Sequence, residues 1–185
     1  SFAHYLSGRY NLHKNGKQEY LLYQHTWDQT NTYLADWQQG NRRPIILPAD
    51  SNSMGYVSDN YASIRGAMVL HQLQNELGMR KMKQIIRTFC RVTRSQTAST
   101  ADFMRIVDSV AQKPMRWFFD QWLFKMGHPI FEVSTSYDRQ RKELKLQVKQ
   151  VQELDSSARY PQVSLFRGKV KLEIEGQIYT VDLAA

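Results

Sequence analysis

The chain has 185 residues, 42% of them hydrophobic and 12% aromatic, so it can bury a core and does not have the composition of a disordered protein. Its formal charge of +8 is spread along the chain, acidic residues lie among several of the basic groups, and no run reaches five or six like charges. No stretch approaches the roughly 18 apolar residues of a membrane span, so we expect no membrane span, and no compartment is indicated.

The first forty residues predict two helices. A short helix is expected from Phe2 to Tyr10, with an interruption around Asn15 and Gly16. A longer amphipathic helix is expected from about Lys17 to Gln39, because aromatic residues recur on one side of it before Gly40 ends the pattern.

A loop of about twenty residues is predicted from Gly40 to Asp59, where prolines and turn-forming residues replace the helical period.

The stretch from Asn60 to Gly78 has the clearest helical pattern and predicts a buried central helix. Its apolar stripe consists of Ile64, Met68, Leu70, Leu73 and Leu77. A glycine inside a helix lowers its stability by roughly 1 kcal/mol against alanine. We therefore expect Gly66 to allow a close approach of another part of the chain. Gly78 is expected to end the helix in a left-handed conformation.

Helices are also expected in the next fifty residues. The segment from Met79 to Arg94 should turn five apolar side chains inward: Met82, Ile85, Ile86, Phe89 and Val92. Ser99 and Asp102 have the spacing of a capping box, which predicts a helix start. Pro114 stands at the opening of a last helix that we expect to end at Gly127.

At Pro129 the apolar period changes from helical to two, and turn signals separate the alternating segments. Four or five antiparallel strands are predicted. The fold class is therefore α+β, with a helical domain over residues 1–127 and an antiparallel β domain over residues 128–185.

Histidine and cysteine patterns predict no complete active site. The histidines, which lie at His4, His13, His25, His71 and His128, have no two members four residues apart with an adjacent glutamate, as a helical zinc site requires. Cys90 is the single cysteine, so we expect a small buried apolar residue. We therefore predict no metal ligand in this chain.

Several segments resemble, in collinear order, the second half of the aminopeptidase N-like zinc metallopeptidases. The motifs that carry the resemblance are S-F-A-H-Y-L, G-N-R-R-P-I, I-R-G-A-M-V-L-H-Q-L-Q-N-E-L-G, T-A-S-T-A-D-F, W-F-F-D-Q-W-L-F-K-M-G-H-P, F-E-V-S-T-S-Y-D and L-K-L-Q-V-K-Q-V-Q. In the third motif, Arg65, Gly66 and Ala67 occupy the family's K-G-A positions.

The resemblance implies the helical half of a thermolysin-like catalytic domain followed by a β-sandwich-type domain. It also implies that the HExxH helix and the third zinc ligand, a glutamate, precede Ser1. Zinc would then be bound by the N-terminal remainder of the same protein, and this chain alone would not hydrolyse peptides.

One family residue is expected within the chain. Family members carry a tyrosine three residues before the K-G-A glycine, and its hydroxyl donates to the oxyanion of the tetrahedral intermediate. That position is Ser63 here, and the nearest tyrosine is Tyr61. Two residues along a helix differ by roughly 200° in direction, so Tyr61 reaches the site only if the segment is non-helical or if the helix begins after Ser63.

Three functions remain open. The chain could be part of a zinc-dependent aminopeptidase, forming one wall of the cleft for a peptide substrate. It could be a catalytically inactive family member that acts as a protein-binding or scaffolding module, as the serine at position 63 suggests. Without the resemblance, it could be a basic helical adaptor for nucleic acid or an acidic protein. We favour the first and expect no nucleic-acid partner.

Overall fold

A computed structural model describes residues 1–23, 32–47 and 60–183. The middle of the predicted second helix, His25 and most of the predicted loop lie outside the described residues. The helices are α1 (Phe2–Asn15), α2 (Lys17–Tyr23), α3 (Leu34–Gln38), α4 (Asn60–Leu77), α5 (Met79–Val92), α6 (Thr100–Ala111) and α7 (Arg116–Trp122). The strands are β1 (Phe131–Asp138), β2 (Glu143–Gln150), β3 (Gly168–Ile174) and β4 (Gln177–Leu183).

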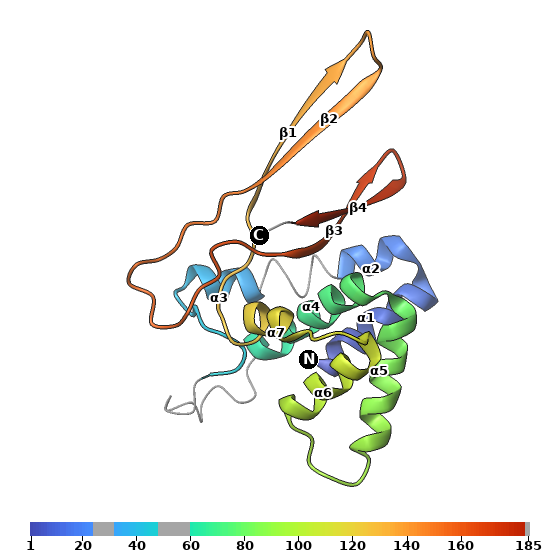
Figure 1. The fold of residues 1–185 in the computed structure, drawn as a ribbon, viewed down its shortest axis with the longest axis vertical. Coiled ribbons are helices and arrows are strands. Elements are labelled where there is room, and N and C mark those ends of the chain that lie inside the picture. Colours follow the sequence, from blue (N-terminus) through green and yellow to red (C-terminus); the bar gives the residue numbers. More distant parts are fainter. Residues whose placement is uncertain (24–31, 48–59, 184–185) are drawn as a thin grey trace.

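The helices form one body, and two β-hairpins extend from one side of it (Figure 1). Strand β1 pairs antiparallel with β2, placing Val133 opposite Val148. Strand β3 pairs antiparallel with β4, placing Val170 opposite Val181. The α+β class is confirmed. The described strands form two separate two-stranded sheets, and the division into two domains at residue 127 stays a prediction.

Helix α4 runs through the middle of the helical body, as predicted. Ile64, Leu70 and Leu73 of its apolar stripe are buried, whereas Met68 and Leu77 are partly exposed. The helix ends where predicted, because Gly78 has a φ of 82° and its N–H donates to the carbonyl of Gln74 at 2.8 Å. Helix α5 begins at the next residue.

Gly66 marks the contact between α1 and α4. A Cβ atom at this position would overlap the side chain of Ser1. Since no other residue lacks a Cβ, glycine is required for α1 to begin so close to α4. The predicted close approach at Gly66 is confirmed.

Other local predictions divide into confirmed and wrong ones. Helix α1 ends at Gly16, as predicted. The predicted capping box is present at the start of α6: the Ser99 Oγ accepts from the Asp102 N–H, and the Asp102 carboxylate accepts from the Ser99 N–H. The predicted burial of Cys90 and Val92 is wrong, because both side chains are exposed. Met82 and Ile85 face the core, and Cys90 points roughly 80° away from Met82 and roughly 140° away from Ile85 around the same helix.

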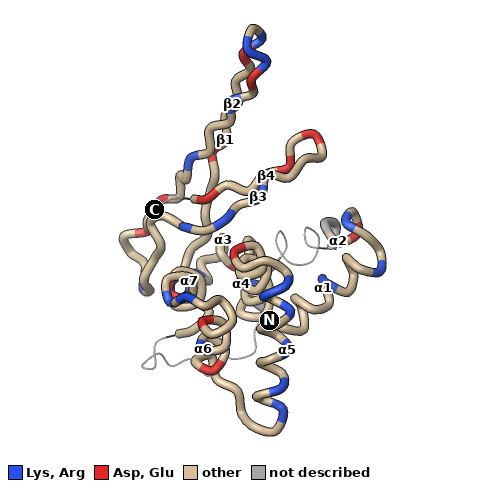
Figure 2. Tube along the Cα trace, turned by 45° about the vertical axis from the view of Figure 1, so that its right-hand side comes forward, with Lys and Arg blue, Asp and Glu red and all other residues tan. Residues whose placement is uncertain are grey.

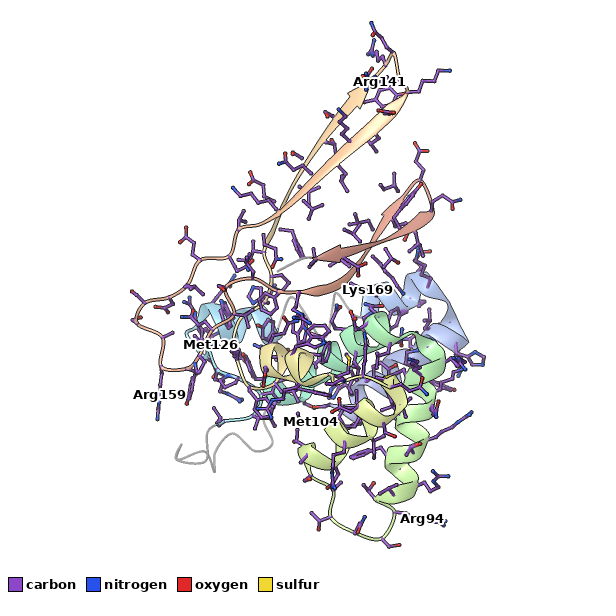
Figure 3. The ribbon with its side chains drawn as sticks, in the orientation of Figure 1. Arg94, Met104, Met126, Arg141, Arg159 and Lys169 are labelled. Atoms are coloured by element: carbon purple, nitrogen blue, oxygen red, sulfur yellow. The ribbon has the colours of Figure 1, made fainter. Side chains whose placement is uncertain are left out.

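The last helix ends earlier than predicted, at Trp122 instead of Gly127. The backbone leaves the helix because it pairs with other segments: the Leu123 carbonyl accepts from Ile46 N–H, and Met126 bonds to both Pro161 and Val163. Figure 3 shows Met126 at this junction and Arg141 at the far tip of the first hairpin.

Residues 166 and 167 are held by two glutamine side chains, one from α7 and one from β2. The amide of Gln121 donates to the Arg167 carbonyl at 2.7 Å and accepts from the Arg167 N–H at 3.2 Å. The amide of Gln150 makes the same pair of bonds with Phe166, at 2.7 and 2.9 Å. Phe166 is 1% exposed, and its ring centroid lies 4.9 Å from that of Trp122. Both hairpins are thus tied to α7.

Candidate functional site

The first turns of α4 place the two candidate residues, Tyr61 and Ser63, in different surroundings. Helix α4 already begins at Asn60, so both residues are helical and their side chains diverge. Tyr61 faces α3 and the segment around Arg43, whereas Ser63 faces α1. One helix start therefore carries two distinct polar clusters.

The Ser63 cluster joins the start of α1 to the start of α4. The Ser63 Oγ lies 3.1 Å from His4 Nδ1 and accepts from the Ser1 amino nitrogen at 3.3 Å. The Ser1 hydroxyl donates to the Ala62 carbonyl at 3.1 Å. Gly66 makes this proximity possible. A serine hydroxyl at this place can donate or accept one further hydrogen bond, and it is partly exposed.

The Tyr61 side chain is fully buried, and its hydroxyl is occupied by protein groups. It donates to the Arg43 carbonyl at 2.7 Å and accepts from Arg65 Nη1 at 3.0 Å. The Arg43 guanidinium lies over the ring, 4.5 Å from its centroid. In the described structure, the single proton of the hydroxyl is therefore directed at a backbone carbonyl. A catalytic role for Tyr61 stays a prediction.

Arg65 connects α4 with the start of α3 and with the segment after α7. The sequence did not predict this role. Arg65 is 3% exposed and donates to the hydroxyls of Tyr61 and Tyr33 and to the Lys125 carbonyl. The signal in the sequence was an arginine next to the first residue of the apolar stripe, Ile64, and four residues after Tyr61. A buried guanidinium needs such acceptors, because removing it from water without hydrogen bonds is strongly unfavourable.

His128 extends this cluster toward the first hairpin. Its Nδ1 lies 3.0 Å from the Tyr33 hydroxyl. Burial raises the pKa of Tyr33, so its hydroxyl keeps its proton. Burial and the nearby Arg65 guanidinium lower the pKa of His128. At neutral pH the ring is uncharged, and its Nδ1 can accept a hydrogen bond from the Tyr33 hydroxyl.

A cleft of about 430 Å³ lies beside this second cluster. Its polar lining comes from Tyr33, Arg65, Gln72 and the two histidines His71 and His128. Burial, followed by the charges of Lys171 and Arg9, lowers the pKa of His71. The cleft therefore offers hydrogen-bonding groups that are neutral at pH 7, next to one fixed positive charge.

The described residues contain no group of three or more His, Cys, Asp or Glu side chains that could hold a metal ion. Among the described helices, none combines the length and the hydropathy that a membrane span requires.

No protein-family model matches the chain. A stretch of 121 residues is 22% identical to transcription initiation factor TFIID subunit 2 of Schizosaccharomyces pombe, covering 60% of this chain and 10% of that protein. Glutamyl aminopeptidase of Bos taurus is 22% identical over 89 residues, covering 48% of this chain and 9% of that protein. The Rattus norvegicus glutamyl aminopeptidase is 26% identical over 90 residues, covering 49% of this chain and 9% of that protein. The chain spans about a tenth of the length of these relatives, and half of it bears a distant similarity to the aminopeptidases.

Proposed function

We propose that this chain is part of an aminopeptidase N-like zinc metallopeptidase and forms one wall of its peptide-binding cleft. The observation that carries the proposal is the contact of the Ser1 side chain with Gly66 and with the Ala62 carbonyl at the start of α4. The resemblance implies a zinc-ligand glutamate directly before Ser1. A contact between Ser1 and the start of α4 brings the position of the expected oxyanion donor close to that ligand.

The zinc of this proposal belongs to the remainder of the protein. The described residues do not form a ligand set for zinc, so they do not fit the metal by themselves. When bound by the remainder, zinc would act as a Lewis acid on the substrate carbonyl and lower the pKa of a bound water. Ser63, His4 and the backbone of α4 would line the cleft beside it.

Two assays on the full-length protein test this function. The first measures zinc content, and the second measures release of an amino acid from an aminoacyl p-nitroanilide. We expect hydrolysis that is lost on adding a chelator and regained on adding zinc. Full-length protein that binds zinc at the implied ligands yet hydrolyses no N-terminal residue would overturn the proposal.

The same assay distinguishes the two donor candidates. Loss of one oxyanion donor lowers kcat by about 100-fold or more. If Tyr61 donates, Tyr61→Phe should show that loss, while Ser63→Ala should not. If Ser63 donates, the pattern should be reversed. Equal small effects from both changes would mean that neither hydroxyl contacts the oxyanion.

A second candidate function is a catalytically inactive member of the same family that binds another protein. It is favoured by the placement of the two hydroxyls, since the Tyr61 hydroxyl is bonded to the Arg43 carbonyl and Ser63 stands at the tyrosine position. The similarity to a subunit of a multisubunit transcription factor also supports it. Absence of an HExxH motif and of the ligand glutamate in the full-length sequence would favour this candidate over the peptidase.

A further inference from the structure

Helix α5 concentrates positive charge in a way that no other described helix does. Residues 79–94 contain six of the chain's 25 lysines and arginines and no aspartate or glutamate. Figure 2 shows basic positions along α5 without an acidic position between them. The whole chain has 25 basic and 17 acidic residues, a net charge of +8, and this one segment contributes +6 of it.

Four of these cations form a line, which we name the α5 stripe: Arg80, Lys83, Arg87 and Arg91. Their steps of three, four and four residues place them on one side of the helix, about 16 Å from end to end at 1.5 Å per residue. All four are exposed, and together with Gln84 and Thr88 they line a shallow depression of about 420 Å³. In the described part of the chain, none of the four makes an ion pair.

In the neighbouring helices α6 and α7, arginines form ion pairs with carboxylates of the same helix. Arg105 of α6 pairs with Asp102, and Arg116 of α7 pairs with Asp120 at 2.7 Å. The fifth cation of α5, Lys81, donates to the Ala111 carbonyl. The stripe residues instead stand beside one another, and like charges three or four residues apart destabilise a helix. Arg80 also lies in the first turn, where the helix dipole disfavours a positive charge.

We propose that the α5 stripe binds an acidic polypeptide segment of a partner protein. Three of its four members are arginines, whose guanidinium groups bind carboxylates through two parallel hydrogen bonds. A length of about 16 Å matches about five residues of an extended peptide at roughly 3.3 Å per residue. The partner's carboxylates would neutralise the charges that repel one another in the free helix.

Other polyanions fit this surface less well. The exposed residues beside the stripe are Gln84, Cys90 and Val92, so the described surface offers no aromatic ring on which a base could stack. Val92 is the single large apolar side chain exposed on this described helix, which is too little for insertion into a lipid surface. The inference concerns α5 and does not depend on the proposed peptidase function.

Fluorescence anisotropy on the full-length protein tests the proposal with a labelled twelve-residue peptide of glutamate and glycine. The stripe variant replaces all four cations by glutamine, which keeps helix propensity and side-chain length. We expect the dissociation constant to rise about tenfold or more, as the loss of several exposed ion pairs implies. The wild-type affinity should also fall as salt is raised from 50 to 300 mM, because salt screens exposed charges.

A matched control removes the same charge elsewhere. The hairpin variant replaces four exposed cations of the first hairpin by glutamine: Arg139, Arg141, Lys145 and Lys149. Its affinity for the peptide should stay within twofold of the wild type. Equal weakening in both variants would show attraction to net charge alone and overturn the proposal. Tighter binding of a single-stranded oligonucleotide or an anionic vesicle, lost in the stripe variant, would also overturn it.

Discussion

Two groups of cations in this molecule are surrounded by opposite environments. Arg43 and Arg65 are each 3% exposed, lie over the Tyr61 ring and donate to protein oxygens. The four members of the α5 stripe are exposed and stand beside like charges. The described residues place no carboxylate on Arg65 either, so neither environment is a simple ion pair. The difference lies in the number of acceptor oxygens that the fold brings to each guanidinium.

The largest expected effect tests the buried side of this comparison. Replacing Arg65 by methionine removes the donor to two hydroxyls and the Lys125 carbonyl. We expect the free energy of unfolding in urea to fall by about 3 kcal/mol, as for several buried groups that lose partners. Arg65→Lys keeps the positive charge, so its free energy of unfolding should fall by less than that of the methionine variant. An unchanged midpoint in the methionine variant would mean that Arg65 does not hold the cluster together.

A smaller effect is expected for Tyr61→Phe. The change leaves the buried Arg43 carbonyl without the hydroxyl donor at 2.7 Å. The expected loss is about 1 to 2 kcal/mol in the same urea experiment. Tyr10, which is 62% exposed, provides the control, because Tyr10→Phe should leave the midpoint unchanged. Equal midpoints for both variants would contradict the role assigned to the Tyr61 hydroxyl.

Protonation of His128 should destabilise the folded protein, because it adds a positive charge beside the buried Arg65. Since the pKa of His128 is lowered in the folded protein, the unfolded chain binds more protons below the ordinary pKa of about 6.5. Stability should therefore be full above that pH and fall as the pH is lowered from 7 to 5. The slope for one group is at most about 1.4 kcal/mol per pH unit, and partial exposure of His128 reduces it.

His128→Gln should flatten this dependence, and urea midpoints measured at each pH provide the test. His13→Gln is the control, because His13 is an exposed histidine outside the buried cluster. His71 has a lowered pKa as well, so part of the slope should persist in the His128 variant. An identical slope in the wild type and in both variants would show that His128 does not cause the dependence of stability on pH.

The smallest expected effect has the opposite sign. The stripe variant of α5 removes three like-charge neighbour pairs, each destabilising by about 0.2 to 0.5 kcal/mol at low salt. The free protein should become more stable by about 1 kcal/mol, and the gain should shrink at high salt. Thermal unfolding monitored by circular dichroism at two salt concentrations measures it. A loss of stability would show that the four cations support the fold.

Local features of the fold could be predicted from the sequence because their causes are local. Gly78, the Ser99 capping box and the strand pairs of each hairpin depend on residues within one turn or one hairpin. The close approach at Gly66 could be predicted from the cost of a glycine inside a helix, but its partner, Ser1, could not. The end of α7 at Trp122 could not be predicted, because it is set by pairing of Met126 with residues 161–163.

The candidate site shows the same limit. Ser63 and Tyr61 were singled out by the resemblance to the aminopeptidase N-like family, and both lie in the helix that begins at Asn60, with their side chains in different surroundings. The partners that decide their chemistry come from far along the chain: His4 and Ser1 for one, Arg43 for the other. Arg65 was seen as a motif position only, since nothing in its neighbourhood indicates Tyr33 or Lys125 as partners.

The glutamine contacts with residues 166 and 167 have a consequence for how this region can change over evolution. Gln121 and Gln150 bond to backbone N–H and C=O groups, which every amino acid except proline presents in the same form. The hydrogen bonds between Gln121 and the backbone of residue 167 therefore do not depend on the side chain at position 167. A substitution of Arg167 by any residue except proline would keep these hydrogen bonds and lose the contact of its guanidinium with the Trp117 ring, 4.2 Å from the ring centroid. The two glutamines, in contrast, cannot be exchanged for glutamate without losing their donor groups.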